Sequence, residues 1–309
     1  MDRNLDRLLE QAVTQVQHGH LDGAIDSLKQ LLSLEPDCAE AHAYLSMCLL
    51  DKRRLHAATK EAEIAITLEP EIELSNYAVA HVMMAQRRFK EAATHLDRLL
   101  DIDPNDERYY RMYADLYHLT NEKDKILPAL QKALELSPDN PDVLADLSDY
   151  YFSTDDLKLA EQFAEDALHR EAEHKHGLVA MGNVLLRYGK VDEARQHAVW
   201  ALRLDPDDRS ALHLISSVKA RSNLFLGLWW KYNSWISNKG TTRSILILLG
   251  AFIVYRIASM LSADLGHSDI ARIINYIWLG IVIYTFVGPT IFTKSLKKEI
   301  SEVQLNREF

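Results

Sequence analysis

Two histidines separated by a single residue form the most metal-like cluster in the sequence. His174 and His176 lie in the run HREAEHKHG, with Glu171 and Glu173 on their N-terminal side. Imidazole and carboxylate groups bind zinc, but a zinc site needs three or four such ligands at fixed positions. No third and fourth ligand stands at a suitable spacing, and a polar run of this kind is more often a solvated turn. We therefore expect no metal and no cofactor.

The spacings of common catalytic sites are also absent from the sequence. It contains no GxSxG nucleophile elbow, no HExxH zinc motif and no GxGxxG dinucleotide loop. Gly189 and Lys190 are followed by Val191, which departs from the GxxxxGK[ST] phosphate loop. The sequence therefore predicts a protein that is not an enzyme, since an enzyme would need a catalytic set that spacing does not reveal.

Charge is divided unequally along the 309 residues, which carry a net charge of −10. Residues 219–309 hold eleven Lys and Arg against five Asp and Glu, a net charge of +6, which leaves −16 for the rest. An acidic N-terminal part repels nucleic acid, whereas a basic segment beside apolar runs suits an anionic membrane surface. We expect membrane lipid, and no nucleic acid, among the partners.

The N-terminus and the cysteines indicate a reducing compartment. The start, MDRNLDRLLEQAVTQV, alternates charge and Leu and lacks the apolar stretch of a secretory signal. Cys38 and Cys48 form no CxxC pair and no disulfide framework. The sequence therefore places the N-terminus in the cytosol.

A period of 34 residues organises the first two thirds of the chain. The runs LEPDCAEAH, LEPEIELSN, IDPNDERYY, LSPDNPDVL and LDPDDRSAL begin at residues 34, 68, 102, 136 and 204. The run at residue 170, REAEHKHGL, keeps the register but lacks the Leu and the Pro. Self-similarity at a fixed period of this length is typical of a stacked array of helical repeats.

The units resemble tetratricopeptide repeats, in which two antiparallel helices approach through small residues. With the turn proline counted as position 32, six units run from 5–38 to 175–208. Position 8 is small in every unit, and position 20 is Ala in all but one, where Ile126 stands. The resemblance implies an all-α superhelical solenoid of six helix pairs over residues 1–222, with 209–222 as a capping helix.

The resemblance also implies a partner-binding groove, lined by positions 2, 5, 9 and 12 of each first helix. These positions select Tyr77, His81, Met84, Arg108, Arg111, Asp115, His118, Asp149, Phe152 and Asn183. The first two units lack the Lys and Asn with which chaperone-type relatives bind a C-terminal carboxylate. Arg108 and Arg111 beside Tyr77 suit an acidic or aromatic segment of a protein or peptide partner. The alternative is a solvated charged face without a ligand.

Two apolar runs, 244–263 and 273–293, predict a transmembrane hairpin over residues 243–293. Each run is long enough to cross about 30 Å of hydrocarbon as a helix. Lys and Arg flank the outer ends of both runs, including the basic tail 294–309, whereas the short loop holds one Arg and two Asp. This bias places both termini in the cytoplasm. The compact chain and simple hairpin favour a bacterial inner membrane over an organelle membrane.

An aromatic segment, residues 223–242, joins the repeats to the first run. Trp229, Trp230 and Trp235 lie within it, and its apolar residues recur every three or four positions. Such a segment is typical of a helix in the headgroup layer of a membrane. Packing against the last repeat is an equal alternative.

Arg256 lies inside the first apolar run, where a charge at mid-bilayer costs on the order of 3 kcal/mol. Snorkelling towards Asp264 at the far interface is the favoured interpretation. A symmetric hairpin would also bring Arg256 to the level of Asn275 and Trp278, as a hydrogen-bond or cation–π partner. Contact with a separate membrane protein is the functional alternative.

Taken as a whole, the sequence predicts a membrane-anchored scaffold or adaptor that binds a protein or peptide at the cytoplasmic face. Homo-oligomer formation is left open. The competing hypothesis is a sensor or oligomerisation subunit of a channel, transporter or membrane-disrupting complex in which the hairpin itself is functional.

Overall fold

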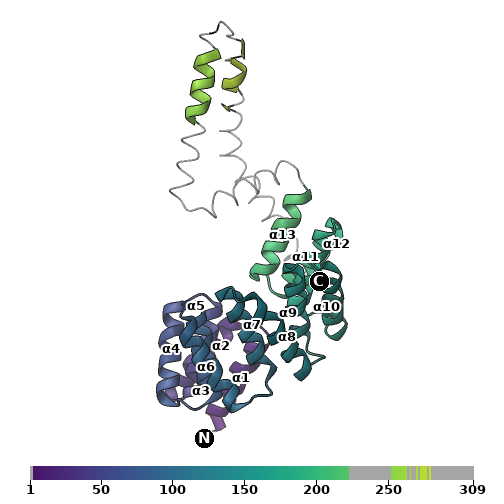
Figure 1. Ribbon diagram of the computed structural model, residues 1–309. Helices are drawn as coiled ribbons and strands as arrows, with labels where there is room; N and C mark the ends of the chain where they lie inside the picture. Colours follow the sequence, from purple (N-terminus) through teal and green to yellow (C-terminus); the bar gives the residue numbers. More distant parts are fainter. Residues whose placement is uncertain are drawn as a thin grey trace, which may run out of the picture. The chain divides into compact units, whose positions relative to one another are not determined.

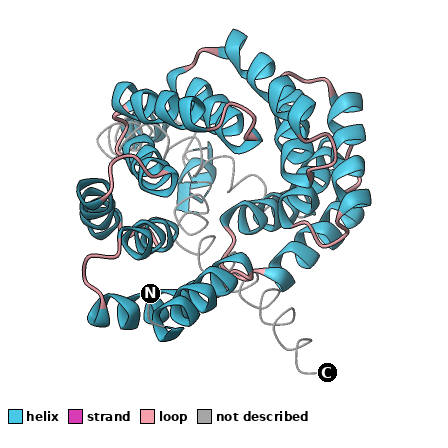
Figure 2. Cartoon of the chain, turned by 90° about the horizontal axis from the view of Figure 1, so that it is seen from below, coloured by secondary structure: helices cyan, strands magenta, loops and turns pink. Residues whose placement is uncertain are grey.

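The computed structural model describes residues 3–222, 252–262, 265, 269–270, 272–276 and 278–279. Within these ranges helices are the regular secondary structure, joined by short turns (Figures 1 and 2). Thirteen helices occupy residues 3–222: α1 (Arg3–Gln17), α2 (Leu21–Leu34), α3 (Ala39–Asp51), α4 (Leu55–Leu68), α5 (Glu73–Ala85), α6 (Phe89–Ile102), α7 (Glu107–Thr120), α8 (Lys123–Leu136), α9 (Pro141–Ser153), α10 (Leu157–Arg170), α11 (Lys175–Arg187), α12 (Val191–Leu204) and α13 (Arg209–Ser222).

The helix boundaries repeat the period of the sequence. The first helices of the units from α3 to α13 begin at residues 39, 73, 107, 141, 175 and 209, each 34 residues after the last. The second helices begin at residues 21, 55, 89, 123, 157 and 191 with the same spacing. The predicted all-α array of six helix pairs followed by one further helix is therefore confirmed.

The turn within each pair has the same backbone conformation in every unit. Position 15 has a positive φ in all six: Gly19 (73°), Arg53 (60°), Arg87 (61°), Asn121 (63°), Asp155 (68°) and Gly189 (84°). Around Arg87, its N–H bonds the Met84 carbonyl at 3.0 Å and the next N–H bonds the Met83 carbonyl at 2.8 Å. A left-handed residue closing a helix in this way reverses the chain and satisfies the last carbonyls.

Small residues at positions 8 and 20 let the two helices of a pair touch. Ala80 and Ala92 are both completely buried, as are their counterparts in the other regular pairs. Where Ser replaces Ala at position 8, its hydroxyl bonds the backbone across the pair. Ser148 Oγ donates to the Ala160 carbonyl at 2.7 Å, and Ser46 makes the same bond in its own unit. The role predicted for these positions is confirmed.

In the second, third and fourth repeats, the side chain at position 4 donates to the carbonyl of the preceding turn proline. His42 Nε2 lies 2.8 Å from the Pro36 oxygen and Asn76 Nδ2 lies 2.8 Å from the Pro70 oxygen. Tyr110 repeats the bond in the fourth unit at 3.0 Å. In these three repeats, the bond satisfies a carbonyl of the turn and holds the start of the first helix against the turn that precedes it.

The chain divides into two compact units, Met1–Ala172 and Glu173–Phe309. The boundary falls at the link whose proline is replaced by Ala172. The first unit contains α1–α10, and Figure 1 shows its antiparallel pairs lying side by side. One core cluster extends from α1 to α7 and a second joins α7, α8 and α9. Cys38 and Cys48 are buried free thiols of the first cluster.

In the second compact unit, Glu173–Phe309, α13 packs on α11 and α12. Gly182 of α11 allows this contact, because a Cβ added there would lie 2.3 Å from Leu214 Cδ2 of α13. Leu214 itself is fully buried. A single glycine therefore sets how closely α13 can approach its neighbour.

The predicted spans, the aromatic segment 223–242 and the basic tail lie mostly or wholly outside the described residues. Residues 252–262 are helical, and parts of 269–279 are helical as well. Among the described helices, none combines the length and apolarity needed to cross a bilayer. The membrane hairpin stays a prediction from the sequence.

Candidate partner-binding surface

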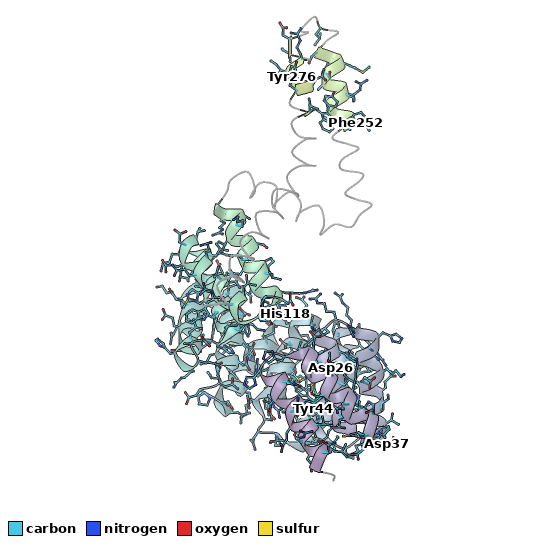
Figure 3. All side chains as sticks on the ribbon, turned by 180° about the vertical axis from the view of Figure 1, so that it is seen from behind. Asp26, Asp37, Tyr44, His118, Phe252 and Tyr276 are labelled. Atoms are coloured by element: carbon cyan, nitrogen blue, oxygen red, sulfur yellow. The ribbon has the colours of Figure 1, made fainter. Side chains whose placement is uncertain are left out.

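Nine of the ten predicted groove residues lie in the first compact unit, on the first helices of three successive repeats. Tyr77, His81 and Met84 belong to α5, the four residues from Arg108 to His118 belong to α7, and Asp149 and Phe152 belong to α9. We call the surface that these nine residues mark the α5–α7–α9 surface; His118 is labelled in Figure 3. Asn183 lies on α11 in the second compact unit and is therefore not part of this surface.

The α5 residues form an aromatic cluster at one end of this surface. The rings of Tyr77 and His81 meet edge to face, with centroids 4.6 Å apart. Burial raises the pKa of Tyr77 and lowers the pKa of His81 to about 4, so both side chains are neutral at pH 7. Met84 is buried in the core at 9% exposure, which leaves little of it for a partner and corrects its predicted place in the groove.

Arg108 is held between two carboxylates of its own chain. Its Nη2 donates to Glu73 Oε1 of α5 at 2.8 Å, and its Nε donates to Asp106 Oδ2 at 2.9 Å. The guanidinium also lies 5.7 Å from the centre of the Tyr77 ring. The hydrogen bond with Asp106 raises the pKa of Arg108, so this charge is permanent.

Arg111 is held in the same way by the next first helix. Its Nε donates to Asp146 Oδ2 at 2.5 Å, and its Nη1 lies 3.1 Å from Asp142 Oδ2. The Arg111 side chain is only 22% exposed. Burial opposes its charge, but the Asp146 carboxylate more than compensates and raises the pKa of Arg111. The pair therefore ties α7 to α9.

Sequence reasoning selected both arginines but missed the carboxylates that hold them. Glu73, Asp106, Asp142 and Asp146 were not among the predicted groove residues. A usable signal was present, since Glu73 precedes Arg108 by 35 residues and Asp146 follows Arg111 by 35, about one period away. Together with Asp115 and Asp149 of the α5–α7–α9 surface, these four neighbouring acids make six carboxylates against two guanidinium groups, a net charge of −4 for this set of residues.

His174, the first of the paired histidines of the link, caps a helix. His174 precedes α11, and its Nδ1 accepts a hydrogen bond from the Gly177 N–H at 3.2 Å. Side-chain caps of this kind satisfy a donor that the first turn of a helix leaves free. In the described part of the chain, no group of three or more His, Cys, Asp or Glu is arranged to hold a metal ion.

Asn275 and Trp278 both contact Tyr255 in the described part of residues 252–279, whereas a symmetric hairpin is expected to bring them level with Arg256. Asn275 Oδ1 accepts from Tyr255 at 2.8 Å and from Ser259 at 3.2 Å. Trp278 stacks on Tyr255 at 4.7 Å between centroids. Arg256 takes no part in these contacts and is exposed, because one step along a helix turns the side chain by about 100°. Asp264, Trp229, Trp230 and Trp235 lie outside the described residues.

Comparison with known proteins supports the repeat assignment. Three family models, each described as a tetratricopeptide repeat, match residues 9–70, 75–116 and 107–140. The human protein O-mannosyl-transferase TMTC1 is 26% identical over 179 residues, which are 55% of this chain and 20% of that protein. The mouse protein of the same name is 26% identical over 152 residues. The chain thus spans at most about a fifth of the curated relatives it matches.

Solved structures agree on the fold. A tetratricopeptide repeat protein from Parabacteroides merdae has a TM-score of 0.59 at 15% identity, covering 71% of this chain and 85% of that one. The Cut9–Hcn1 structure of the APC/C has a TM-score of 0.54 at 14% identity, covering 69% and 42%. At such identity the likeness concerns the fold alone. Residues 9–70 and 75–140 of this chain therefore carry tetratricopeptide repeats.

Proposed function

We propose that this protein is a scaffold or adaptor that is anchored in a membrane and binds a protein or peptide through its repeats. Tetratricopeptide repeat proteins bind protein or peptide partners. The observation that carries the proposal is the α5–α7–α9 surface, where ion pairs fix charged side chains beside an aromatic cluster. Side chains held in place before binding lose less conformational entropy when a partner arrives.

The charge of this surface favours a partner segment that carries Lys or Arg. Both arginines are already neutralised by carboxylates of the chain, which removes the reason to expect an acidic segment. The net charge of −4 attracts cations, and Tyr77 and Phe152 supply apolar contact area. Complementary charge mainly accelerates association and selects between partners.

Membrane anchoring by residues 243–293, with both termini on the cytoplasmic side, is the second part of the proposal. Two features support it: the apolar runs with their basic flanks, and the apolar side chains exposed on the described hairpin residues. Val254, Ile257, Met260 and Tyr276 are between 59% and 67% exposed; Phe252 and Tyr276 are labelled in Figure 3. Exposed apolar area of this kind marks a lipid or protein contact. A bacterial inner membrane remains the preferred location.

The partner surface can be tested by affinity capture with the full chain. We expect Asp115→Lys with Asp149→Lys to lose the captured partners, because both reversals remove negative charge from the α5–α7–α9 surface. Asp26→Lys with Asp101→Lys makes the same change in net charge at exposed positions on the second helices α2 and α6. A partner set that both variants retain would refute the surface assignment.

The anchor can be tested separately by carbonate extraction of membranes. We expect the full chain to resist extraction and a chain lacking residues 243–293 to be released. Release of the full chain by carbonate would refute the membrane anchor but would not contradict the proposed α5–α7–α9 binding surface.

A second candidate function is a sensor or oligomerisation subunit of a channel or transporter. It is favoured by the polar contacts among Tyr255, Ser259 and Asn275 in a mostly apolar region. Polar groups at such depth often serve transport or helix association. Replacing residues 243–293 with an unrelated two-span anchor decides between the two: an adaptor keeps its activity, and a channel component loses it. The matches cover at most about a fifth of the mannosyl-transferase relatives, so we propose no transferase activity.

A further inference from the structure

The turns inside the second and third repeats carry a concentration of positive charge. Positions 15–18 read RRLH and RRFK in these two repeats, five Lys and Arg without an acid, and Lys52 precedes the first run. The same positions of the fourth and fifth repeats read NEKD and DDLK, two acids and one Lys in each. The charge therefore belongs to two adjacent repeats and is not a general property of this turn. We call residues 52–54 together with 87–90 the basic turn edge.

The two turns of the basic turn edge are neighbours in the first compact unit. The helices that end at them, α3 and α5, pack against each other. Gln86 Nε2 donates to Thr59 Oγ1 of α4 at 2.7 Å, which ties the second turn to the repeat before it. Packed helices lie about 10 Å apart, so the two turns present their charges as one short row.

Part of this charge is not neutralised by the chain. Lys52 and Arg88 each form an ion pair with one exposed carboxylate. Arg54 and Arg87 are exposed, and their side chains form no hydrogen bond or ion pair with the residues that the structure describes. These two guanidinium groups are therefore available to an anion from outside the chain.

The backbone favours glycine where two of these arginines stand. Arg53 and Arg87 have φ values of 60° and 61°, whereas the first and sixth repeats have Gly19 and Gly189 at this position. A side chain with a Cβ makes this conformation costly in free energy. Arg87 recovers none of that cost through an ion pair within the described chain. A residue kept against the preference of the backbone points to a function for its side chain.

We propose that the basic turn edge binds the anionic headgroups of a phospholipid bilayer. Each Lys or Arg beside an anionic leaflet contributes about fivefold in affinity. Protein interfaces usually have an apolar centre. Between residues 35 and 101, all of which are described, no large apolar side chain is exposed, so the edge suits a lipid surface better than a protein. The inference rests on the proposed membrane anchor, which brings the repeats to such a surface.

Fluorescence quenching in vesicles tests the basic turn edge in the full chain. Ala85→Cys places a bimane label at the end of α5 near Arg87, and Glu71→Cys places one near the other end of this helix, about 20 Å away. Both positions are exposed and both native cysteines are buried, so the label reacts with the introduced thiol. The chain is reconstituted in phosphatidylcholine vesicles with or without roughly 30% phosphatidylglycerol, and a nitroxide on the lipid headgroup is the quencher.

We expect the Ala85 label to be quenched roughly threefold more in the anionic vesicles, and the Glu71 label to respond equally to both. Salt at about 0.5 M should remove the difference, because it screens the charges. Arg53→Gly with Arg87→Gly should lower the ratio of docked to undocked chains by roughly 25-fold. Glycine suits the backbone at both positions, so unfolding would not explain this loss.

A matched variant controls for net charge. Lys29→Gln with Arg98→Gln removes two positive charges from exposed positions on α2 and α6, and should leave the quenching unchanged. Equal quenching of the Ala85 label in neutral and anionic vesicles would overturn the lipid assignment. Quenching that survives Arg53→Gly with Arg87→Gly would overturn the role of the turn arginines.

Flotation of the vesicles reports on the membrane anchor separately. An anchored chain floats with neutral vesicles, whether or not the basic turn edge binds lipid. A chain that does not float with neutral vesicles lacks the anchor, and the edge is then tested by flotation with the anionic vesicles. That flotation should be lost in Arg53→Gly with Arg87→Gly, and its retention would overturn the inference.

Discussion

The left-handed turn at position 15 offers a stability experiment in which the chain supplies its own controls. Arg53 and Arg87 adopt φ values of 60° and 61° although both carry a Cβ. Both side chains are exposed, so their replacement removes little packing. The perturbation is Arg87→Gly, with Gly189→Ala as the reverse change at the same position of another unit.

The two changes should have opposite signs. A left-handed conformation costs a non-glycine residue roughly 1–2 kcal/mol. Glycine offsets part of this gain by losing about 0.5–1 kcal/mol more chain entropy on folding. Arg87→Gly should therefore stabilise the protein by about 0.5–1 kcal/mol. A Cβ at Gly189 would meet no atom within 4 Å, so Gly189→Ala should cost about 1 kcal/mol through the backbone alone.

Urea denaturation of the full chain, followed by helical circular dichroism, measures these changes. Repeat arrays unfold through coupled units, so the midpoint is compared only between variants with the same slope. Hydrogen exchange at residues 82–92 reports whether the Arg87→Gly effect is local. Asn121→Gly serves as the graded control, with a smaller gain because Asn tolerates this conformation. Destabilisation by Arg87→Gly as large as that by Gly189→Ala would refute the conformational argument.

Three further predictions concern buried groups. Burial lowers the pKa of His81 to about 4, so as the pH falls the histidine is protonated in the unfolded chain before it is protonated in the folded one. The stability that the neutral His81 side chain contributes is complete above about pH 6.5. It declines by roughly 3 kcal/mol as the pH falls to about 4. His81→Gln should lose that part of the pH dependence in urea titrations between pH 4.5 and 7.5, and an unchanged slope would contradict it. Gly182→Ala should destabilise the second compact unit, because overpacking against Leu214 costs about 1–3 kcal/mol and exceeds the gain of about 1 kcal/mol in helix propensity. Thermal denaturation measures this loss of stability. If overpacking is the cause, the loss should be smaller when Gly182→Ala is made in the Leu214→Ala variant. A double-mutant cycle of Arg111→Met and Asp146→Asn should give a coupling of about 1 kcal/mol or more for this half-buried pair, whereas additive changes would argue against it.

Local features of the fold could be predicted from the sequence because they depend on neighbouring residues. The 34-residue period, the small residues at positions 8 and 20, and the turn prolines each act within one hairpin or between adjacent hairpins. They predicted six helix pairs, a further helix at 209–222 and an all-α fold, and the helix boundaries follow the same period. The division at Ala172 also falls where the sequence departs from its pattern.

The contacts between side chains of different units depended on the tertiary structure. Whether Arg111 meets Asp142 and Asp146, or Tyr255 rather than Arg256 meets Asn275, depends on how far each helix is rotated about its axis. One residue corresponds to a rotation of about 100°, so residues that are adjacent in sequence face different surroundings. The neutral state of His81 has the same origin, since burial arises from neighbours that only the packed array brings together. The sequence by itself determined which helices form and in what order, because those choices are local. The tertiary structure decided which charges remain for a partner, because pairing and burial act across repeats.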